Sequence, residues 1–201
     1  MKNIVFYVKL NSGVKGGIEK LVAELSNSLK DRFNVYVLCD SFKGAEFPYF
    51  LEKEVHKIHL PFRANGRFIL SLRKLLHSIS PDCVVVMRTG GNVMEVFAAA
   101  MKGMAGKLVM SEHCAPSIAI NEYKNTTRET CLFCADYIHL LLEGYKNSVP
   151  ASIKNRVKII PNFCDNKFAK VDFCERKNQI VMVGRLTKNQ KTTNVIIRSI
   201  R

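Results

Sequence analysis

Three basic residues follow an apolar run near the end of the chain. The run 180–183 stops at Gly184, and Arg185, Lys188 and Lys191 come next. Arginine presents a fork of donors that matches a phosphate group, and lysine supplies a mobile positive charge. Two such residues on one strand-exit loop would hold a diphosphate. From the residues alone, an ordinary basic solvated loop is the favoured interpretation.

A carboxylate and a histidine stand together in the middle of the chain, where Glu112 and His113 follow the apolar run 107–110. A histidine at the end of a strand can hydrogen-bond a sugar hydroxyl or carry a proton. The alternative is a surface histidine without a role. The position favours a function, because a histidine that only packs lies more often inside a strand or helix than at its exit.

The loop 11–19 contains three glycines, of which Gly16 and Gly17 are adjacent. Glycine lets the backbone approach a ligand closely, and free amides at a helix start favour negatively charged groups. The spacing matches neither the dinucleotide-binding pattern nor a Walker loop. Taken by itself, the loop fits a flexible connector equally well.

The seven cysteines are an odd number without a disulfide-framework spacing, so we expect reduced and mostly buried thiols. Cys131 and Cys134, with His113 and Cys114 upstream, have the residue types of a zinc site. Only one such pair exists, and its surroundings are apolar. Two packed thiols are therefore the favoured interpretation, and we expect no metal ion.

These candidate residues need elements that position them, and the chain alternates between predicted strands and helices. Strands this apolar must be buried on both faces, which predicts a parallel sheet between helices. We therefore expect an α/β fold with a doubly wound, Rossmann-like sheet that binds ligands at the carboxyl ends of its strands. The predicted strands are 2–8, 35–39, 55–60, 83–87, 107–110, 137–142 and 156–160, and the predicted helices are 18–29, 68–79, 93–101, 123–134 and 144–148.

The charge balance favours a polyanionic partner. Lys and Arg number 31 against 17 Asp and Glu, a net charge of +14. The basic residues are spread out and do not cluster with aromatic residues, so we expect no nucleic-acid partner. An anionic membrane surface fits this spread better, and a generally basic solvated surface is the alternative.

The segment 62–74 is the candidate for membrane contact, because Phe62 and Phe68 stand beside four basic residues, Arg63, Arg67, Arg73 and Lys74. A helix with an ordinary core face and a solvated basic face is the favoured alternative. No apolar run is long enough to cross a bilayer, and the chain start leads directly into a strand. We expect a cytoplasmic protein that contacts the inner face of the membrane peripherally.

Four segments together resemble a known enzyme family. They are Gly16-Gly17-Ile18-Glu19, Glu112-His113, Ile159-Ile160-Pro161-Asn162-Phe163-Cys164-Asp165 and Val183-Gly184-Arg185-Leu186. Their order and separations resemble those of the retaining, nucleotide-sugar-dependent glycosyltransferases of the GT-B fold, family four. The resemblance extends over nearly the whole chain, and the Ile-Pro-Asn and Gly-Arg-Leu segments are its most specific part.

The resemblance implies two Rossmann-like domains, with the acceptor bound mainly by the first and the nucleotide-sugar mainly by the second. By resemblance, Gly16 and Gly17 lie near the donor phosphates, His113 touches the transferred sugar, and Arg185 with Lys191 neutralises the diphosphate leaving group. No metal ion is then required. The same resemblance adds further residues to the donor and substrate site, namely Glu112, Asn162, Gly184 and Lys188.

Two departures from the family pattern affect these expectations. The family places its lysine one residue closer to Gly-Arg-Leu than Lys191 stands, so Lys188 is an alternative for the phosphate role. The family also has a downstream acidic pair, which has no counterpart up to Arg201. We expect an acceptor-binding domain at 1–165, a linker at 166–178, and the first strand and helix of a truncated donor domain at 179–201.

The resulting hypothesis is a glycosyltransferase, or a fragment of one, that transfers a sugar from a nucleotide-diphosphate sugar with retention. Its acceptor would be a glycolipid or polysaccharide, as in lipopolysaccharide synthesis. The alternative is a non-catalytic remnant or binding subunit that needs a partner catalytic domain. Because the acidic pair is missing, we do not expect this chain alone to be a competent transferase.

Overall fold

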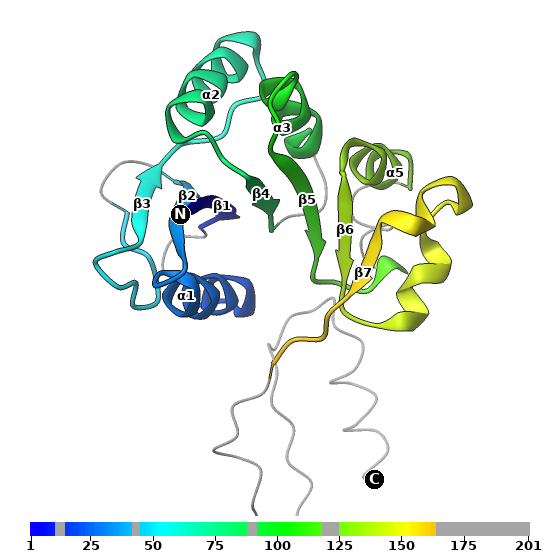
Figure 1. The fold of residues 1–201 in the computed structure, drawn as a ribbon. Helices are drawn as coiled ribbons and strands as arrows, with labels where there is room; N and C mark the ends of the chain where they lie inside the picture. Colours follow the sequence, from blue (N-terminus) through cyan, green and yellow to red (C-terminus); the bar gives the residue numbers. More distant parts are fainter. Residues whose placement is uncertain (11–14, 42–44, 88–91, 118–124, 164–201) are drawn as a thin grey trace, which may run out of the picture. The chain divides into compact units, whose positions relative to one another are not determined.

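A seven-stranded parallel sheet forms the centre of the computed structural model, which describes residues 1–10, 15–41, 45–87, 92–117 and 125–163 (Figure 1). The chain divides into two compact units, Met1–Asn162 and Phe163–Arg201. All the elements below belong to the first unit. The predicted α/β, Rossmann-like fold is confirmed.

The strands follow the order β3-β2-β1-β4-β5-β6-β7, and every neighbouring pair is parallel. The chain therefore runs outward from β1 on one side, then crosses back to β4 and continues on the other side. Ligands of such sheets bind at the carboxyl edge. The strands are β1 (Lys2–Lys9), β2 (Phe33–Asp40), β3 (His56–His59), β4 (Cys83–Val86), β5 (Lys107–Glu112), β6 (Tyr137–Leu140) and β7 (Val157–Ile159).

Helices cover both faces of the sheet. Helix α1 packs on one face, and α2, α3 and α5 pack on the other (Figure 1). The predicted helix near residues 144–148 is a 3₁₀ helix, η1, and a second 3₁₀ helix, η2, was not predicted. The bounds are α1 (Gly17–Leu29), α2 (Gly66–Ile79), α3 (Val93–Met101), α5 (Asn125–Cys134), η1 (Glu143–Ser148) and η2 (Ala151–Arg156).

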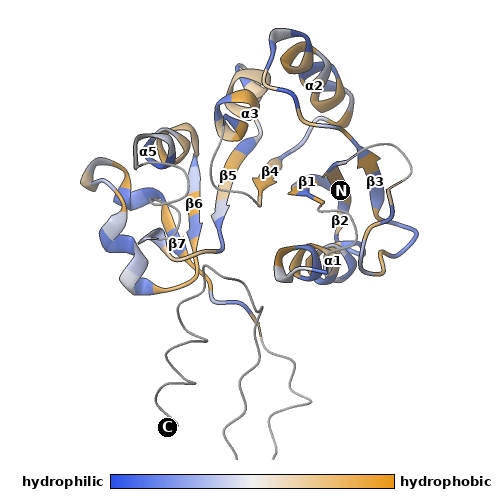
Figure 2. Cartoon of the chain, turned by 180° about the vertical axis from the view of Figure 1, so that it is seen from behind, coloured by the Kyte–Doolittle hydropathy of each residue, from blue (hydrophilic) through white to orange (hydrophobic). Residues whose placement is uncertain are grey.

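Strand β1 shows how one apolar run serves two cores. Val5 and Tyr7 belong to the core beneath α2, α3 and α5, while Phe6 and Val8 belong to the core beneath α1. Successive side chains of a strand point to opposite faces, so a strand covered on both sides must be apolar throughout. Figure 2 shows the same character in β4, which is coloured hydrophobic along its length.

The predicted membrane-contact segment 62–74 is partly core and partly surface in the structure. Phe68 is buried in the core, and Phe62 packs against it with their ring centroids 5.3 Å apart. Arg73 donates to the carbonyl oxygens of Ala100 and Lys102 at the end of α3. The aromatic half of the predicted patch therefore packs in or against the core, and α2 has a core face and a basic outer face. Contact of this basic face with a membrane stays a prediction. No helix among the described residues has the length and apolarity that a membrane crossing needs.

Candidate functional site

The described candidate residues lie at the carboxyl edge of the sheet. Gly16 immediately precedes α1 and Gly17 is its first residue, Glu112 ends β5 and His113 follows it, and Asn162 lies after β7 with an exposed side chain. Parallel strands bring all of these exits to one edge. Four further candidates, Gly184, Arg185, Lys188 and Lys191, lie outside the described residues.

Alternation along β5 sends neighbouring side chains to opposite faces. Met110 belongs to the core beneath α5, and Glu112, two residues on, points to the same side as Met110. Ser111 therefore points to the opposite face. The exit of β5 consequently holds two separate polar networks, one on each face of the sheet.

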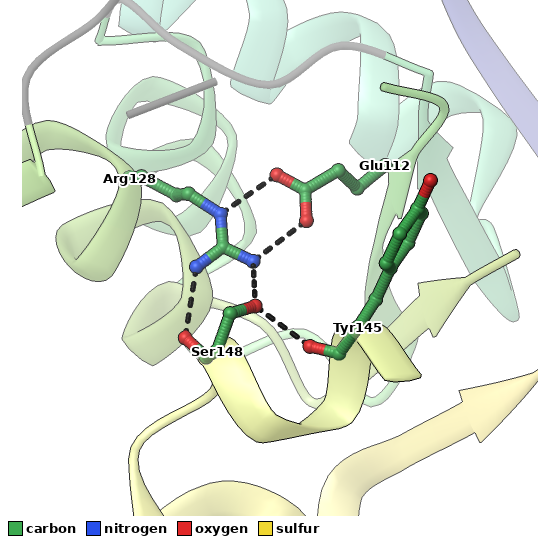
Figure 3. Close-up of polar contacts among 4 residues, drawn as sticks. All are labelled: Glu112, Arg128, Tyr145 and Ser148. Atoms are coloured by element: carbon green, nitrogen blue, oxygen red, sulfur yellow. Dashed lines mark hydrogen bonds and ion pairs between the residues drawn. The ribbon is translucent and has the colours of Figure 1, made fainter. Parts of the chain in front are cut away.

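The first network is a buried ion pair between Glu112 and Arg128 of α5 (Figure 3). Arg128 Nε donates to Glu112 Oε1 at 2.8 Å, and Nη2 donates to Oε2 at 2.7 Å. Both side chains are completely buried. The guanidinium also donates to the Oγ and the carbonyl oxygen of Ser148 in η1, each at 3.0 Å, and Ser148 Oγ donates to the Tyr145 carbonyl oxygen.

This bidentate pair ties the end of β5 to α5 and η1. A buried carboxylate or guanidinium is tolerated only when its hydrogen bonds are satisfied, and here each partner satisfies the other. Glu112 thus has a role inside the protein, and its contact with a substrate stays a prediction. Sequence reasoning missed Arg128, whose only signal is its position three and four residues before the buried Cys131 and Leu132 on one helix face.

The second network joins His113 to the neighbouring strands. Ser111 Oγ lies 2.7 Å from His113 Nε2 and 2.7 Å from His139 Nδ1. His139 Nε2 lies 2.8 Å from the carbonyl oxygen of Ile160, just after β7. The register explains this contact, because Ser111 pairs with His139 across β5 and β6. Three strands therefore contribute to the position of one histidine, and His139 was not among the predicted site residues.

His113 is neutral at pH 7. Burial, and secondarily the nearby His139, lowers the pKa of His113 to about 4. A neutral imidazole does not attract a phosphate by charge, but it forms hydrogen bonds with hydroxyl groups. The site at His113 is therefore suited to an uncharged polar group.

Gly16 precedes α1 and lies against the side chain of Glu19. A Cβ atom on Gly16 would collide with the Glu19 carboxylate, whereas a Cβ on Gly17 would meet no atom within 4 Å. Glu19 is buried in the first turn of α1, where the amide groups at the helix start favour negative charge. Close packing therefore explains the glycine at position 16, and packing does not explain the glycine at position 17.

The described residues contain no group of three or more His, Cys, Asp or Glu side chains that would hold a metal ion. Cys131 is buried and Cys134 is half-buried in α5. Burial also raises the pKa of Cys39 to about 12 and that of Cys83 to about 11, so these two thiols remain protonated.

Comparison with solved structures finds proteins of the same fold. HepE from Anabaena, in complex with UDP and glucose, is 16% identical with a TM-score of 0.59, and the match covers 85% of this chain and 47% of HepE. UDP-GlcNAc 2-epimerase from Methanocaldococcus jannaschii is 14% identical with a TM-score of 0.52, covering 79% of this chain and 45% of the epimerase.

The S. aureus protein MnaA, solved with UDP, is 12% identical with a TM-score of 0.55, covering 79% of this chain and 43% of MnaA. No protein-family model matches the sequence, and no curated protein does. The chain spans about half the length of the solved structures that it matches. It is therefore similar in fold to one half of these proteins.

Proposed function

We propose that this chain is a glycosyltransferase, or part of one, that takes a sugar from a nucleoside-diphosphate sugar and transfers it with retention to a glycolipid or polysaccharide. The observation that carries the proposal is the neutral His113, held by hydrogen bonds at the carboxyl edge of a Rossmann-like sheet. The same fold occurs in HepE, which was solved with UDP and glucose. The family resemblance of the sequence supports the same assignment.

In this proposal, His113 accepts a hydrogen bond from the transferred sugar. The backbone at Gly16 and Gly17 approaches the donor phosphates, and Arg185 with Lys191 or Lys188 neutralises the diphosphate. Negative charge develops on the leaving phosphate as the glycosidic bond breaks. Fixed cations stabilise that charge more strongly in the transition state than in the ground state.

The acceptor hydroxyl would attack on the face that the diphosphate leaves. Attack on this face retains the anomeric configuration. The proton of the hydroxyl passes to the departing phosphate oxygen, and this step requires no metal ion. Among the remaining candidates, Glu112 fixes the exit of β5 through Arg128, while Asn162 and Gly184 belong to the donor-binding loops.

The acceptor side of the proposal rests on charge. The net charge is +14, and the outer face of α2 exposes Arg67, Leu70 and Lys74. Basic groups around an exposed apolar side chain suit the anionic surface of a membrane. We therefore propose that the protein lies peripherally on the cytoplasmic membrane face.

A ligand-observed saturation-transfer NMR experiment tests the proposal. We expect the chain to transfer saturation to the sugar protons of a UDP- or GDP-sugar, and His113→Ala to abolish this transfer. His77→Ala is the matched control, because His77 is exposed on α2 and has no role in the site. Absence of transfer with every sugar nucleotide would reject donor binding. Binding that is indifferent to His113→Ala would favour a binding subunit over a transferase.

A further inference from the structure

We propose that Ser111 and His139 are positioning residues that hold His113 in its Nε2–H tautomer, so that Nδ1 accepts a hydrogen bond from a sugar hydroxyl. The inference rests on the proposed function and deepens it, because it states the chemistry of the group that the site recognises. That group is a hydrogen-bond donor and not a phosphate oxygen.

The assignment of protons starts at the carbonyl oxygen of Ile160. A carbonyl can only accept, so His139 Nε2, at 2.8 Å, must carry the proton that it donates. In the neutral form of the His139 ring the other nitrogen is then an acceptor. In that form His139 Nδ1 accepts from the hydroxyl of Ser111, at 2.7 Å.

The hydroxyl of Ser111 has one proton, and that proton is directed at His139. Toward His113 the same oxygen can only accept, so His113 Nε2, at 2.7 Å, must be the donor. The neutral His113 ring then has its lone pair at Nδ1. Among the described residues, none donates to this nitrogen.

The hydrogen bonds that run from Ile160 through His139 and Ser111 to His113 form a relay, and the sheet holds this relay in place. Ser111 is 1% exposed, and the register of β5 and β6 places it beside His139. The two imidazole rings lie edge to face with centroids 5.6 Å apart. A hydroxyl fixed between two rings leaves little rotational freedom, so the relay passes the orientation imposed by Ile160 on to His113.

The chemistry of the ligand follows from the lone pair. Nδ1 repels the oxygens of a phosphate and attracts the proton of a hydroxyl or amide. The lowered pKa of His113 agrees with this, since the ring stays neutral at pH 7. His113 therefore binds a hydroxyl of the sugar, and the diphosphate must be bound by other groups.

Long-range ¹⁵N NMR of the histidine-labelled chain measures the tautomers directly. We expect both rings to show a protonated Nε2 and an unprotonated Nδ1 in the ligand-free protein. UDP-glucose should shift the His113 Nδ1 signal upfield, as an accepted hydrogen bond does, and inorganic phosphate should leave it unchanged. A protonated His113 Nδ1, or a shift caused by phosphate, would overturn the inference.

Substitution of Ser111 separates positioning from packing. In Ser111→Ala we expect His113 to show a mixture of tautomers, and UDP-glucose binding to weaken about three- to tenfold while UDP binding is unchanged. The matched control is Ser78→Ala, which replaces an exposed serine of α2. If Ser111→Ala does not fold, Ser111→Cys and His139→Phe supply the same comparison. An unchanged His113 tautomer in a folded variant would refute the relay.

The two hypotheses fail in different ways. If His113 carries its proton on Nδ1 while UDP-glucose still binds, the relay is wrong and the proposed function stands. If the tautomers are as stated but no sugar nucleotide perturbs His113, the relay exists and the proposed function is wrong.

Discussion

At the scale of single residues, the exit of β5 concentrates the polar chemistry of the described chain. Glu112 is bound to Arg128 on one face of the sheet, and Ser111 joins His113 to His139 on the other. Both arrangements depend on partners that are distant in sequence. Each makes a separate, measurable contribution to the fold.

Removing one charge of the buried pair should be costly. Glu112→Gln leaves Arg128 as an unpaired buried cation, so we expect the free energy of unfolding to fall by about 3–5 kcal/mol. Urea unfolding measures the change. The control is Glu24→Gln, which removes an exposed i,i+4 pair with Lys20 and should cost less than about 1 kcal/mol. Equal effects of the two substitutions would contradict the assigned role of the pair.

His113 should make stability depend on pH. Its pKa is lowered from 6.5 to about 4 in the folded chain, so the unfolded chain takes up a proton that the folded chain rejects. The stability that depends on a neutral His113 is fully present above pH 6.5 and is lost as the pH falls to about 4. Because the ring is partly exposed, we expect no more than about 2–3 kcal/mol.

The measurement is urea unfolding of the unmodified chain and of His113→Gln across that pH range. The difference between the two isolates the histidine from the carboxylates. We expect the unmodified chain to lose more stability than the variant between pH 6.5 and 4. Parallel pH curves would show that His113 is not buried as described.

At the scale of elements, the strand and helix pattern could be predicted because each apolar run is local in sequence. The positions of most strands and helices follow from that pattern, although the predicted strand 107–110 ends two residues before β5 does, at Glu112. The pairing of Arg128 with Glu112 and of Ser111 with His139 could not be predicted. Both pairs depend on strand register and helix packing, which bring together residues that are far apart in the chain.

The start of α1 offers a paired test of the two glycines. Gly16→Ala forces Glu19 to move and should destabilise the chain by about 1 kcal/mol. Gly17→Ala meets open space in the first turn of a helix, so we expect unchanged or slightly higher stability. If the donor phosphates approach this backbone, Gly17→Ala should nevertheless weaken UDP-glucose binding about tenfold.

Thermal unfolding and a binding isotherm of Gly17→Ala give the two results independently. Unchanged binding in this stable variant would contradict a phosphate contact at position 17. Gly16→Ala combined with Glu19→Ala removes the collision, and recovered stability in that variant would confirm its cause.

At the scale of the whole molecule, the excess of 14 positive charges gives the protein a general attraction to anionic surfaces. The outer face of α2 adds an exposed leucine between basic residues. The charge alone does not select a partner. The arrangement on α2 is what favours a membrane.

Charge removal on α2 tests this membrane contact. Each basic group near an anionic leaflet contributes about 1 kcal/mol, so Arg67→Gln with Lys74→Gln should weaken binding to phosphatidylserine vesicles roughly 30-fold. Cosedimentation measures this. Lys53→Gln with Lys57→Gln removes the same charge from another exposed part of the chain and should have a much smaller effect. Equal losses would mean that net charge, and not α2, governs the binding.

The central claim is that His113 contacts the sugar of a nucleotide-sugar. Intermolecular nuclear Overhauser effects between UDP-glucose and the isotopically labelled chain test it most directly. We predict cross-peaks from the glucose ring protons to the His113 imidazole protons, and none to the exposed His77. Bound UDP-glucose whose sugar protons show contacts elsewhere and none to His113 would contradict the claim.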